Sequence, residues 1–482
     1  MGDDRRRLHC SGEDRISGLP DELLHGILLR LGSTRAAVRT SVLSRRWRHV
    51  WASLPELILV GGPIDGIDGV LAAYSSSAPT TLDRLAISLS ACRDDVSRVP
   101  AERVAPWLRF AAERVAGELC LVVIPPSVTP PLHVASRPDL ELAVCGRAKT
   151  ITLHLQEKWL LRPTAAGLFT ALTGLVIFDA RMKGDELAAL VWTQCPCLRD
   201  LELSVTLVDA FGDVCIRSDS LRSLWFRIRN ALKVEIVAPR LEKLSVCYAA
   251  AARISAPNLV ELVWCSNYDP VPRQHQFDSV SRRLGLLQIT DRNCTEASVM
   301  QKFDEADELK LHISIPKGAL GYGRFLDETN KMPKCKVLNV TLVPNDHGFA
   351  PGMLHLLRTS KSTKKILINL YDNPEKSCPL YCPCRLEENC RVDDIDVGSL
   401  EEVEISSHSS SCEVLLEFVE LLSRCNTTRF KKLAINYHKR FHTTETKQVC
   451  KKIRSMHRPN IEIKFYVLLT GGLVHFDYIG GL

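Results

Sequence analysis

The sequence predicts a mixed α/β protein in which a small helical unit is followed by a solenoid of parallel strands and by a C-terminal region of alternating strands and helices. Three patterns lead to this prediction. Apolar residues recur at helical spacing between residues 14 and 57, a short apolar repeat runs from residue 82 to residue 264, and strand-like and helix-like segments alternate from residue 399 to residue 469. With 482 residues, 45% of them hydrophobic, the chain is long enough for roughly three folded units.

The N-terminal segment is expected to form three short helices. Pro20 suits the first turn of a helix because its missing N–H costs nothing there, and Gly32 is expected to end that helix. Ser33 or Thr34 can cap the second helix and Ser44 the third. One face of the third helix is expected to gather Leu43, Trp47, Val50, Trp51 and Leu54, beside a polar face with Arg45, Arg46, Arg48 and His49.

A unit of about forty residues buries too little surface to be comfortably stable alone. Its surplus of leucines and tryptophans therefore favours a surface that a partner protein covers. Two other interpretations stay open: a bundle docked on the rest of the chain, or a helix-turn-helix unit that binds DNA through Arg45, Arg46 and Arg48. Trp47 and Trp51 argue against DNA binding, because a recognition helix needs exposed polar side chains.

The stretches LPDELLHGILLRL and AAVRTSVLSRRWRHVW, within Asp14 to Leu54, closely resemble an F-box in the form common among plant F-box proteins with leucine-rich repeats. The resemblance implies docking on the Skp-type adaptor of a cullin-RING ubiquitin ligase. It also implies that Leu19 and Pro20 lie in the adaptor groove. Apolar contacts with the adaptor, or the core beneath them, are then expected from Leu23, Ile27, Val38, Val42, Leu43 and Trp47.

A recurring pattern of the form Leu-x-x-Leu-x-apolar predicts a solenoid with one strand per repeat. The steps from Leu198 to Leu221, Leu241 and Leu259 are 23, 20 and 18 residues, which is compatible with leucine-rich repeats. We expect every apolar position of the pattern to belong to the core. These positions are Leu82, Leu85, Ile87, Leu172, Leu175, Ile177, Leu198, Leu201, Leu203, Leu221, Leu224, Phe226, Leu241, Leu244, Val246, Leu259, Leu262 and Trp264.

The residues between the repeats decide what backs the strands. The stretch GDELAALVWTQC predicts a helix with Leu187, Leu190 and Val191 on its buried side. The shorter repeats lack room for a helix, so loops or a second strand are expected there, with LKVEIVAP as the best strand candidate. A target protein would contact outward side chains of the sheet such as Arg199, Asp200, Glu202, Arg222, Trp225, Glu242 and Lys243, among which none stands out.

The C-terminal third is expected to contain the strands DELKLHISI and KCKVLNVTLV, and then a strand-helix-strand-helix-strand series that ends with NIEIKFYVLL. This series resembles the FBD region that closes many plant F-box proteins, and the resemblance implies an α+β cap on the open end of the solenoid. The expected division is a disordered N-terminus at 1–13, the F-box at 14–57, the leucine-rich-repeat solenoid at 70–345 and the FBD-like region at 346–482.

The cysteines contain one cluster that could carry chemistry. Cys378, Cys382, Cys384 and Cys390 lie within thirteen residues and could hold zinc, but their intervals of three, one and five residues differ from paired Cys-x-x-Cys knuckles. We therefore expect a reduced loop, with no metal site and no cofactor. Eighteen scattered cysteines without an export signal indicate a reducing compartment, the cytoplasm or the nucleus. The sequence offers no phosphate loop, His-Glu-x-x-His motif or nucleophile elbow, so no catalytic residue is expected.

The main hypothesis is a non-catalytic substrate receptor of a ubiquitin ligase, whose F-box binds the Skp-type adaptor, and through it the cullin and RING subunits, while the repeats bind a target protein. The alternative is a repeat scaffold that binds a protein partner without ubiquitin transfer. A net charge of +6 from 62 basic and 56 acidic residues is too small a field to indicate nucleic acid. Four prolines between Leu119 and Ser136 exclude an ordinary membrane helix in the longest uncharged apolar stretch.

Overall fold

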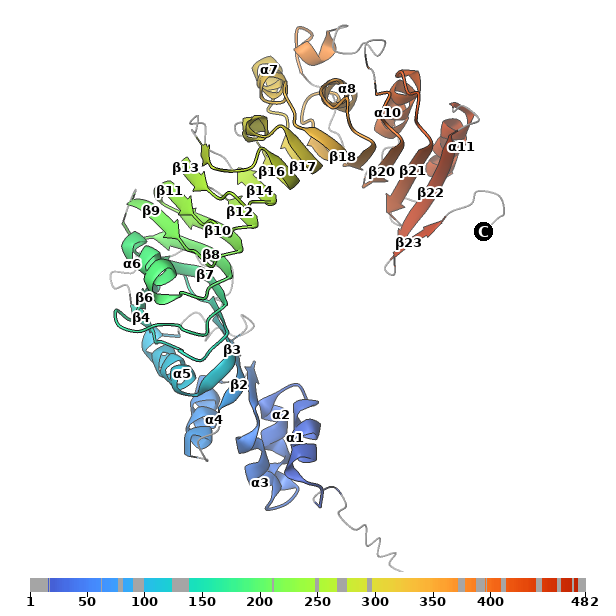
Figure 1. The fold of residues 1–482 in the computed structure, drawn as a ribbon. Coiled ribbons are helices and arrows are strands. Elements are labelled where there is room, and N and C mark those ends of the chain that lie inside the picture. The colour runs from blue at the N-terminus through green and yellow to red at the C-terminus, as the bar shows by residue number, and fades with distance from the viewer. Residues whose placement is uncertain are drawn as a thin grey trace, which may run out of the picture. The chain divides into compact units, whose positions relative to one another are not determined.

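The computed structural model describes most of the chain, in two compact units, Met1–Asp209 and Ala210–Leu482. The described residues are 16, 18–61, 63–76, 81–89, 99–123, 138–209, 212–247, 251–266, 275–292, 297–371, 378–386, 395, 397–408, 413–438, 444–456, 461–469 and 472–475. Residues 1–13, expected to be disordered, lie outside these ranges. The expected α/β architecture of N-terminal helices followed by parallel strands is confirmed, and Figure 1 shows the elements of each unit.

The first unit opens with helices α1 (Asp21–Leu29), α2 (Thr34–Arg39) and α3 (Trp47–Val50), with 3₁₀ turns at Thr40–Val42 and Trp51–Ser53. Two expected boundaries are confirmed: Gly32 takes a φ of +67° after α1, and the Ala36 N–H donates to Ser33 Oγ at 3.3 Å. The third helix differs from its prediction because it begins at Trp47, with Arg46 rather than Ser44 at its N-cap position. Residues 43–46 form a turn instead, and this turn places Leu43 outside the apolar face of α3.

Six parallel strands form the sheet of the first unit, in the order β1 (Glu56–Val60), β2 (Leu82–Leu89), β3 (Val115–Val123), β5 (Thr150–His154), β7 (Gly174–Met182) and β8 (Asp200–Leu207). Their register aligns one buried row, made of Leu57, Leu85, Leu119, Ile151, Leu175 and Leu201. Strand β4 (Asp139–Leu142) pairs with β6 (Leu160–Pro163). The repeat therefore builds a continuous hydrophobic core along the strands.

Helices α4 (Ile64–Ser76), α5 (Ala101–Arg114) and α6 (Gly184–Ala189) complete the first unit. Helix α6 continues as one π-turn over Leu190–Gln194, and its predicted inner residues Leu187, Leu190 and Val191 are buried. The apolar stretch from Leu119 begins as strand β3 rather than as a helix, and residues 124–137 lie outside the described ranges. Among the helices that the structure describes, none has both the length and the apolar composition of a membrane span.

The second unit has a longer parallel sheet with strand order β10 (Ser223–Arg229), β12 (Lys243–Cys247), β14 (Glu261–Ser266), β16 (Arg283–Asp291), β17 (Glu305–Ser314), β18 (Lys334–Val343) and β19 (Lys365–Leu370). A second parallel sheet contains β9 (Gly212–Arg217), β11 (Ala231–Val237), β13 (Ala251–Ser255) and β15 (Gln276–Asp278). Strand β11 is the predicted LKVEIVAP strand, so the short repeats do use a second strand in place of a helix.

Helices replace the second sheet toward the C-terminus: α7 (Gly318–Glu328), α8 (Phe349–Thr359), α10 (Glu413–Arg424) and α11 (Thr444–Met456) lie along one face of the strands (Figure 1). The expected strand-helix-strand-helix-strand order is confirmed by β20 (Glu402–Ser407), α10, β21 (Lys432–His438), α11 and β22 (Glu462–Leu469). These strands continue the parallel sheet from β19. The final strand β23 (Gly472–His475) pairs antiparallel with β22. All apolar positions named for the repeat pattern are buried, as predicted.

Candidate functional site: the surface of the N-terminal helices

The N-terminal helices share one hydrophobic core that contains both tryptophans. Trp47 is 2% exposed and packs in a cluster with Leu24, Leu28, Trp51 and Leu54. Val70 and Ala73 of α4 pack against the same cluster. The three helices therefore gain apolar burial from the next helix of the chain, which explains how so small a unit stays folded.

Hydrogen bonds tie this core to its surroundings at both ends. The His25 ring contacts the Val50 carbonyl with Nε2 at 3.2 Å, and Arg46 donates to Asp21 Oδ1 at 2.5 Å, so α1 is held against α3. The Ile58 N–H donates to Thr34 Oγ1 at 2.7 Å, which joins α2 to strand β1. The Tyr74 hydroxyl donates to the Leu54 carbonyl at 3.0 Å in a buried position. The Arg46–Asp21 pair is exposed and adds little stability, whereas the buried contacts hold the helices in place.

The outer surface of the helices is unusually apolar. Leu23 and Val42 are 55% and 87% exposed, and Leu43 is 63% exposed. Sixteen large hydrophobic side chains are exposed among the described residues, and six of them belong to the short stretch from residue 16 to residue 43: Ile16, Leu23, Ile27, Leu31, Val42 and Leu43. Such a concentration of exposed apolar side chains is typical of a protein-binding surface.

The structure separates the predicted adaptor-facing residues into surface and core. Pro20, Leu23, Ile27, Val42 and Leu43 are exposed, and Leu19 and Val38 are half-buried and pack against the core cluster. Trp47 lies in the core beneath them. The prediction leaves out Ile16 and Leu31, although Leu23, Ile27 and Leu31 follow one another at four-residue steps and this spacing could have identified Leu31.

The outward side chains named for target binding belong to both units, with Arg199, Asp200 and Glu202 in the first and Arg222, Trp225, Glu242 and Lys243 in the second. All seven are exposed or half-buried, as expected for positions that alternate with the core. Several are engaged with neighbours on the next strand: Arg222 pairs with Glu242 at 3.1 Å, and Lys243 pairs with Glu261 at 2.9 Å. Exposed pairs of this kind contribute little stability and leave the surface polar.

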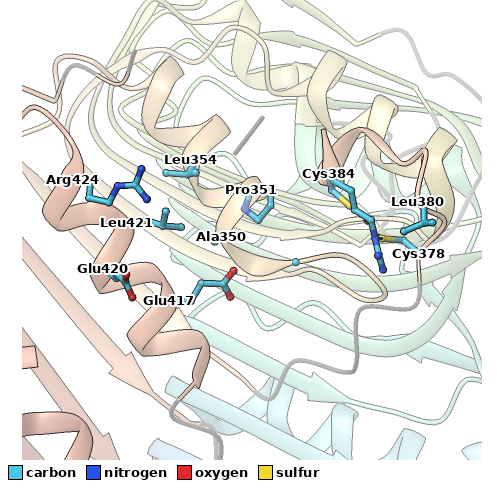
Figure 2. A pocket seen from close by; sticks show the side chains of 12 residues that line it. Ala350, Pro351, Leu354, Cys378, Leu380, Cys384, Glu417, Glu420, Leu421 and Arg424 are labelled. Atoms are coloured by element: carbon cyan, nitrogen blue, oxygen red, sulfur yellow. Dashed lines mark hydrogen bonds between the residues drawn. The ribbon is translucent and has the colours of Figure 1, made fainter. Parts of the chain in front are cut away.

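The second unit contains a separate cavity of about 670 Å³ between α8, residues 378–386 and α10 (Figure 2). Leu354 and Leu421 supply an apolar part of its wall, and Glu417, Glu420 and Arg424 supply charged groups. Its size lies within the range of small-molecule pockets. The cavity is therefore a second candidate site, remote in sequence from the N-terminal helices.

Comparison with known proteins gives two family matches. Residues 16–59 match the F-box domain, and residues 104–271 match the LRR repeats of the FBD-associated F-box protein At5g56370. The F-box match contains every residue of the candidate surface described above. The repeat match begins within α5 and ends beyond β14, so it crosses strands of both units.

Three relatives from Arabidopsis thaliana illustrate the similarity. The chain is 29% identical over 236 residues to F-box protein At5g03100, a match that covers 48% of this chain and 69% of the relative. It is 27% identical over 255 residues to FBD-associated F-box protein At1g60410, covering 50% and 59% respectively. A shorter match of 80 residues with F-box/LRR-repeat protein 25 reaches 46% identity and covers 16% and 30%.

Proposed function

We propose, from the premise that this chain is an F-box protein with the leucine-rich repeats of the FBD-associated F-box family, that it is the substrate-recognition subunit of a cullin-RING ubiquitin ligase. In this role the F-box binds the Skp-type adaptor, which connects the chain to the cullin and RING subunits. The repeats bind a target protein, and residues 346–482 form an FBD-like region that closes the solenoid. The chain itself carries no catalytic residue in this proposal.

The exposed apolar surface of the N-terminal helices is the observation that carries the proposal. Leu23 and Ile27 lie one helical turn apart on α1, which suits insertion of an apolar helix face into a groove of a partner. Val42 and Leu43, at the end of the 3₁₀ turn that follows α2, form a second exposed apolar group. Trp47 supports this surface from the core, so its expected contribution is to the shape of the surface.

The proposed contribution to ubiquitin transfer is positional. A target held on the repeats would be kept near the ubiquitin carrier that the RING subunit recruits, which raises the effective concentration of the reacting groups. None of the cysteines in the described part of the chain forms a disulfide, in keeping with a place in the cytoplasm or the nucleus. This location is thus supported by two points, the reduced state of the described cysteines and the identity of the proposed ligase partner.

Co-purification with a Skp-type adaptor tests the proposal. The full chain should form a stable complex with the adaptor, and the complex should become ubiquitinated when cullin, RING subunit and ubiquitin carrier are supplied. A Leu19→Ala, Pro20→Ala double variant should lose adaptor, whereas Leu168→Ser, at a site 51% exposed in the same unit, should keep it. A folded chain that binds no adaptor would support the scaffold interpretation instead and would overturn the proposal.

A further inference from the structure

Four metal-ligand side chains meet in the second unit, outside the surface described above. His347, Cys378, Cys382 and Cys384 are all buried, and their ligand atoms lie within 4.8 Å of one another. Cys384 Sγ lies 3.3 Å from the sulfurs of Cys378 and Cys382. His347 Nδ1 lies 3.5 Å from the sulfurs of Cys382 and Cys384. Three thiols and one imidazole nitrogen therefore lie close enough together for one metal ion to reach all four.

The surroundings of His347 leave Nδ1 available as a ligand. On the other side of the ring, Nε2 lies 2.9 Å from the Pro316 carbonyl oxygen and 3.0 Å from Asp346 Oδ1. The Pro316 carbonyl oxygen can only accept a hydrogen bond, so the ring proton belongs on Nε2 and is donated to that oxygen, while the lone pair of Nδ1 faces the sulfurs of Cys382 and Cys384. A histidine that binds a metal is held in this way, with its second nitrogen donating to a carbonyl or a carboxylate.

The segment 378–386 exposes its large apolar side chains and buries its cysteines. Leu380 and Tyr381 are strongly exposed, whereas the three cysteines of the segment are buried. The segment is attached to the turn before α8, where the Cys378 N–H donates to the Asp346 carbonyl at 3.2 Å. Burial alone is common for cysteine, but it does not require three thiols and a buried imidazole nitrogen to lie within 4.8 Å of one another, whereas a bound metal ion does.

The charge of the cluster is also balanced for a metal. Three thiolates and a neutral histidine around a divalent cation leave a net charge of −1. Arg385 donates from Nε to Cys378 Sγ at 3.2 Å and places a positive charge beside the cluster. Hydrogen bonds to ligating sulfurs of this kind are a regular part of metal sites.

We propose that His347, Cys378, Cys382 and Cys384 bind one zinc ion in a tetrahedral structural site. Zinc bonds of about 2.3 Å to sulfur and about 2.0 Å to nitrogen require S···S distances near 3.8 Å and S···N distances near 3.5 Å in a tetrahedron. The two S···N distances of 3.5 Å meet this requirement, and the sulfur pairs at 3.3 Å need only a small outward shift. All four tetrahedral positions are filled by protein groups, which is typical of structural sites.

The set of ligands explains why the sequence pattern did not indicate zinc. The cysteines come in an irregular run, and the fourth ligand is a histidine 35 residues before Cys382, brought in by the turn after β18. Cys390, the fourth member of the run, lies outside the described residues. Zinc at this site would fix the segment 378–386 as one wall of the 670 Å³ cavity, where Cys378 and Cys384 line the surface (Figure 2).

Metal analysis of the full chain tests the proposal. The protein is produced with supplemented zinc, purified with a reducing agent and without chelator, and analysed by inductively coupled plasma mass spectrometry. Wild type should hold about one zinc ion per chain. The His347→Ala and Cys384→Ser variants should lose most of it, whereas Cys425→Ser, which removes a buried thiol in the same unit, and Cys390→Ser should retain it.

Cobalt binding tests the site in the wild-type protein, so the result does not depend on whether a variant folds. Metal-stripped wild type titrated with cobalt(II) should develop the visible bands of a tetrahedral thiolate site, and about one equivalent of zinc should remove them. Wild type without zinc or cobalt signal, iron in place of zinc, or zinc that survives His347→Ala but not Cys390→Ser would overturn the assignment. Adaptor binding does not enter these measurements, so their failure leaves the proposed ligase function to its own test.

Discussion

Removing the exposed apolar side chains of Leu23 and Val42 from the N-terminal surface should weaken adaptor binding without unfolding the protein. The double variant Leu23→Ser, Val42→Ser takes away side chains that are 55% and 87% exposed. Complete burial of a leucine or valine contributes about 1.5–3 kcal/mol, so the exposed parts correspond to about 1 and about 2 kcal/mol respectively. If the adaptor covers even two thirds of this surface, Kd should rise about 30-fold, because about 1.4 kcal/mol corresponds to a factor of ten.

Stability measurements separate this effect from a fold defect. Surface substitutions of this kind should change the free energy of unfolding by no more than about 0.5 kcal/mol each. Trp47→Ala is the contrasting core variant and should lower the free energy of unfolding by about 3–5 kcal/mol, because it leaves a cavity in a well-packed cluster.

Isothermal titration calorimetry with purified adaptor gives Kd, and chemical denaturation gives stability. Leu168→Ser serves as the matched surface control, since it removes an exposed leucine elsewhere in the first unit. An unchanged Kd for the double variant, with the control also unchanged, would refute the assignment of this surface to the adaptor.

Three further predictions concern stability and thiol chemistry. Burial lowers the pKa of His355 from 6.5 to about 4. The stabilisation that the neutral ring gives is therefore complete above about pH 6.5 and is lost as the pH falls toward 4. Chemical denaturation of wild type and of His355→Gln should show this stabilisation reduced by about 2 kcal/mol at pH 5 relative to pH 7. A hydrogen bond with Cys247 lowers the pKa of Cys265 to about 7 against the opposing effect of burial. Alkylation of Cys265 by iodoacetamide, followed by peptide mass spectrometry, should therefore reach half its maximal rate near pH 7. A midpoint near the ordinary pKa of a thiol would contradict this. A Cβ at Gly117 would lie 2.2 Å from the Asp83 carbonyl oxygen. The Gly117→Ala substitution should therefore force β2 and β3 apart and lower the free energy of unfolding by about 1–3 kcal/mol. An unchanged thermal midpoint would show instead that the two strands adjust without cost.

The repeat strands could be predicted from sequence because one local pattern fixes both their period and their buried side. In each Leu-x-x-Leu-x-apolar copy the spacing of two assigns the second leucine and the last apolar residue to the same face of a strand. Parallel pairing in register then aligns equivalent residues, as Leu224, Leu244 and Leu262 do on neighbouring strands. A second strand was one of two alternatives expected for the short repeats, because a step of 18 to 20 residues leaves no room for a helix, and the candidate LKVEIVAP does form strand β11.

The N-terminal helices show where local pattern is insufficient. Helical spacing placed Leu43 on the same face as Trp47, but the turn at residues 43–46 starts α3 later and leaves Leu43 exposed. The position of a turn depends on tertiary contacts such as that of the His25 ring with the Val50 carbonyl, which joins residues 25 apart in the chain. Which apolar residues become surface and which become core was therefore not accessible from spacing alone.

The sequence singled out the cysteine cluster but not its histidine, for a related reason. Three of its four members lie close together in sequence, but the spacing of ligands in the chain says little when the chain returns to an earlier turn. His347 enters the cluster only because the segment 378–386 folds back onto the residues that follow β18. No periodic pattern connects positions related in this way.

The packing of α4 on the N-terminal core determines where this protein can be divided for transplantation. A fragment that stops at the end of β1 would lose Val70 and Ala73 from the cluster and the hydrogen bond from Tyr74 to Leu54. A fragment that runs through Ser76 retains all three. Chimaeras that exchange F-boxes between proteins of this kind should therefore be joined beyond α4.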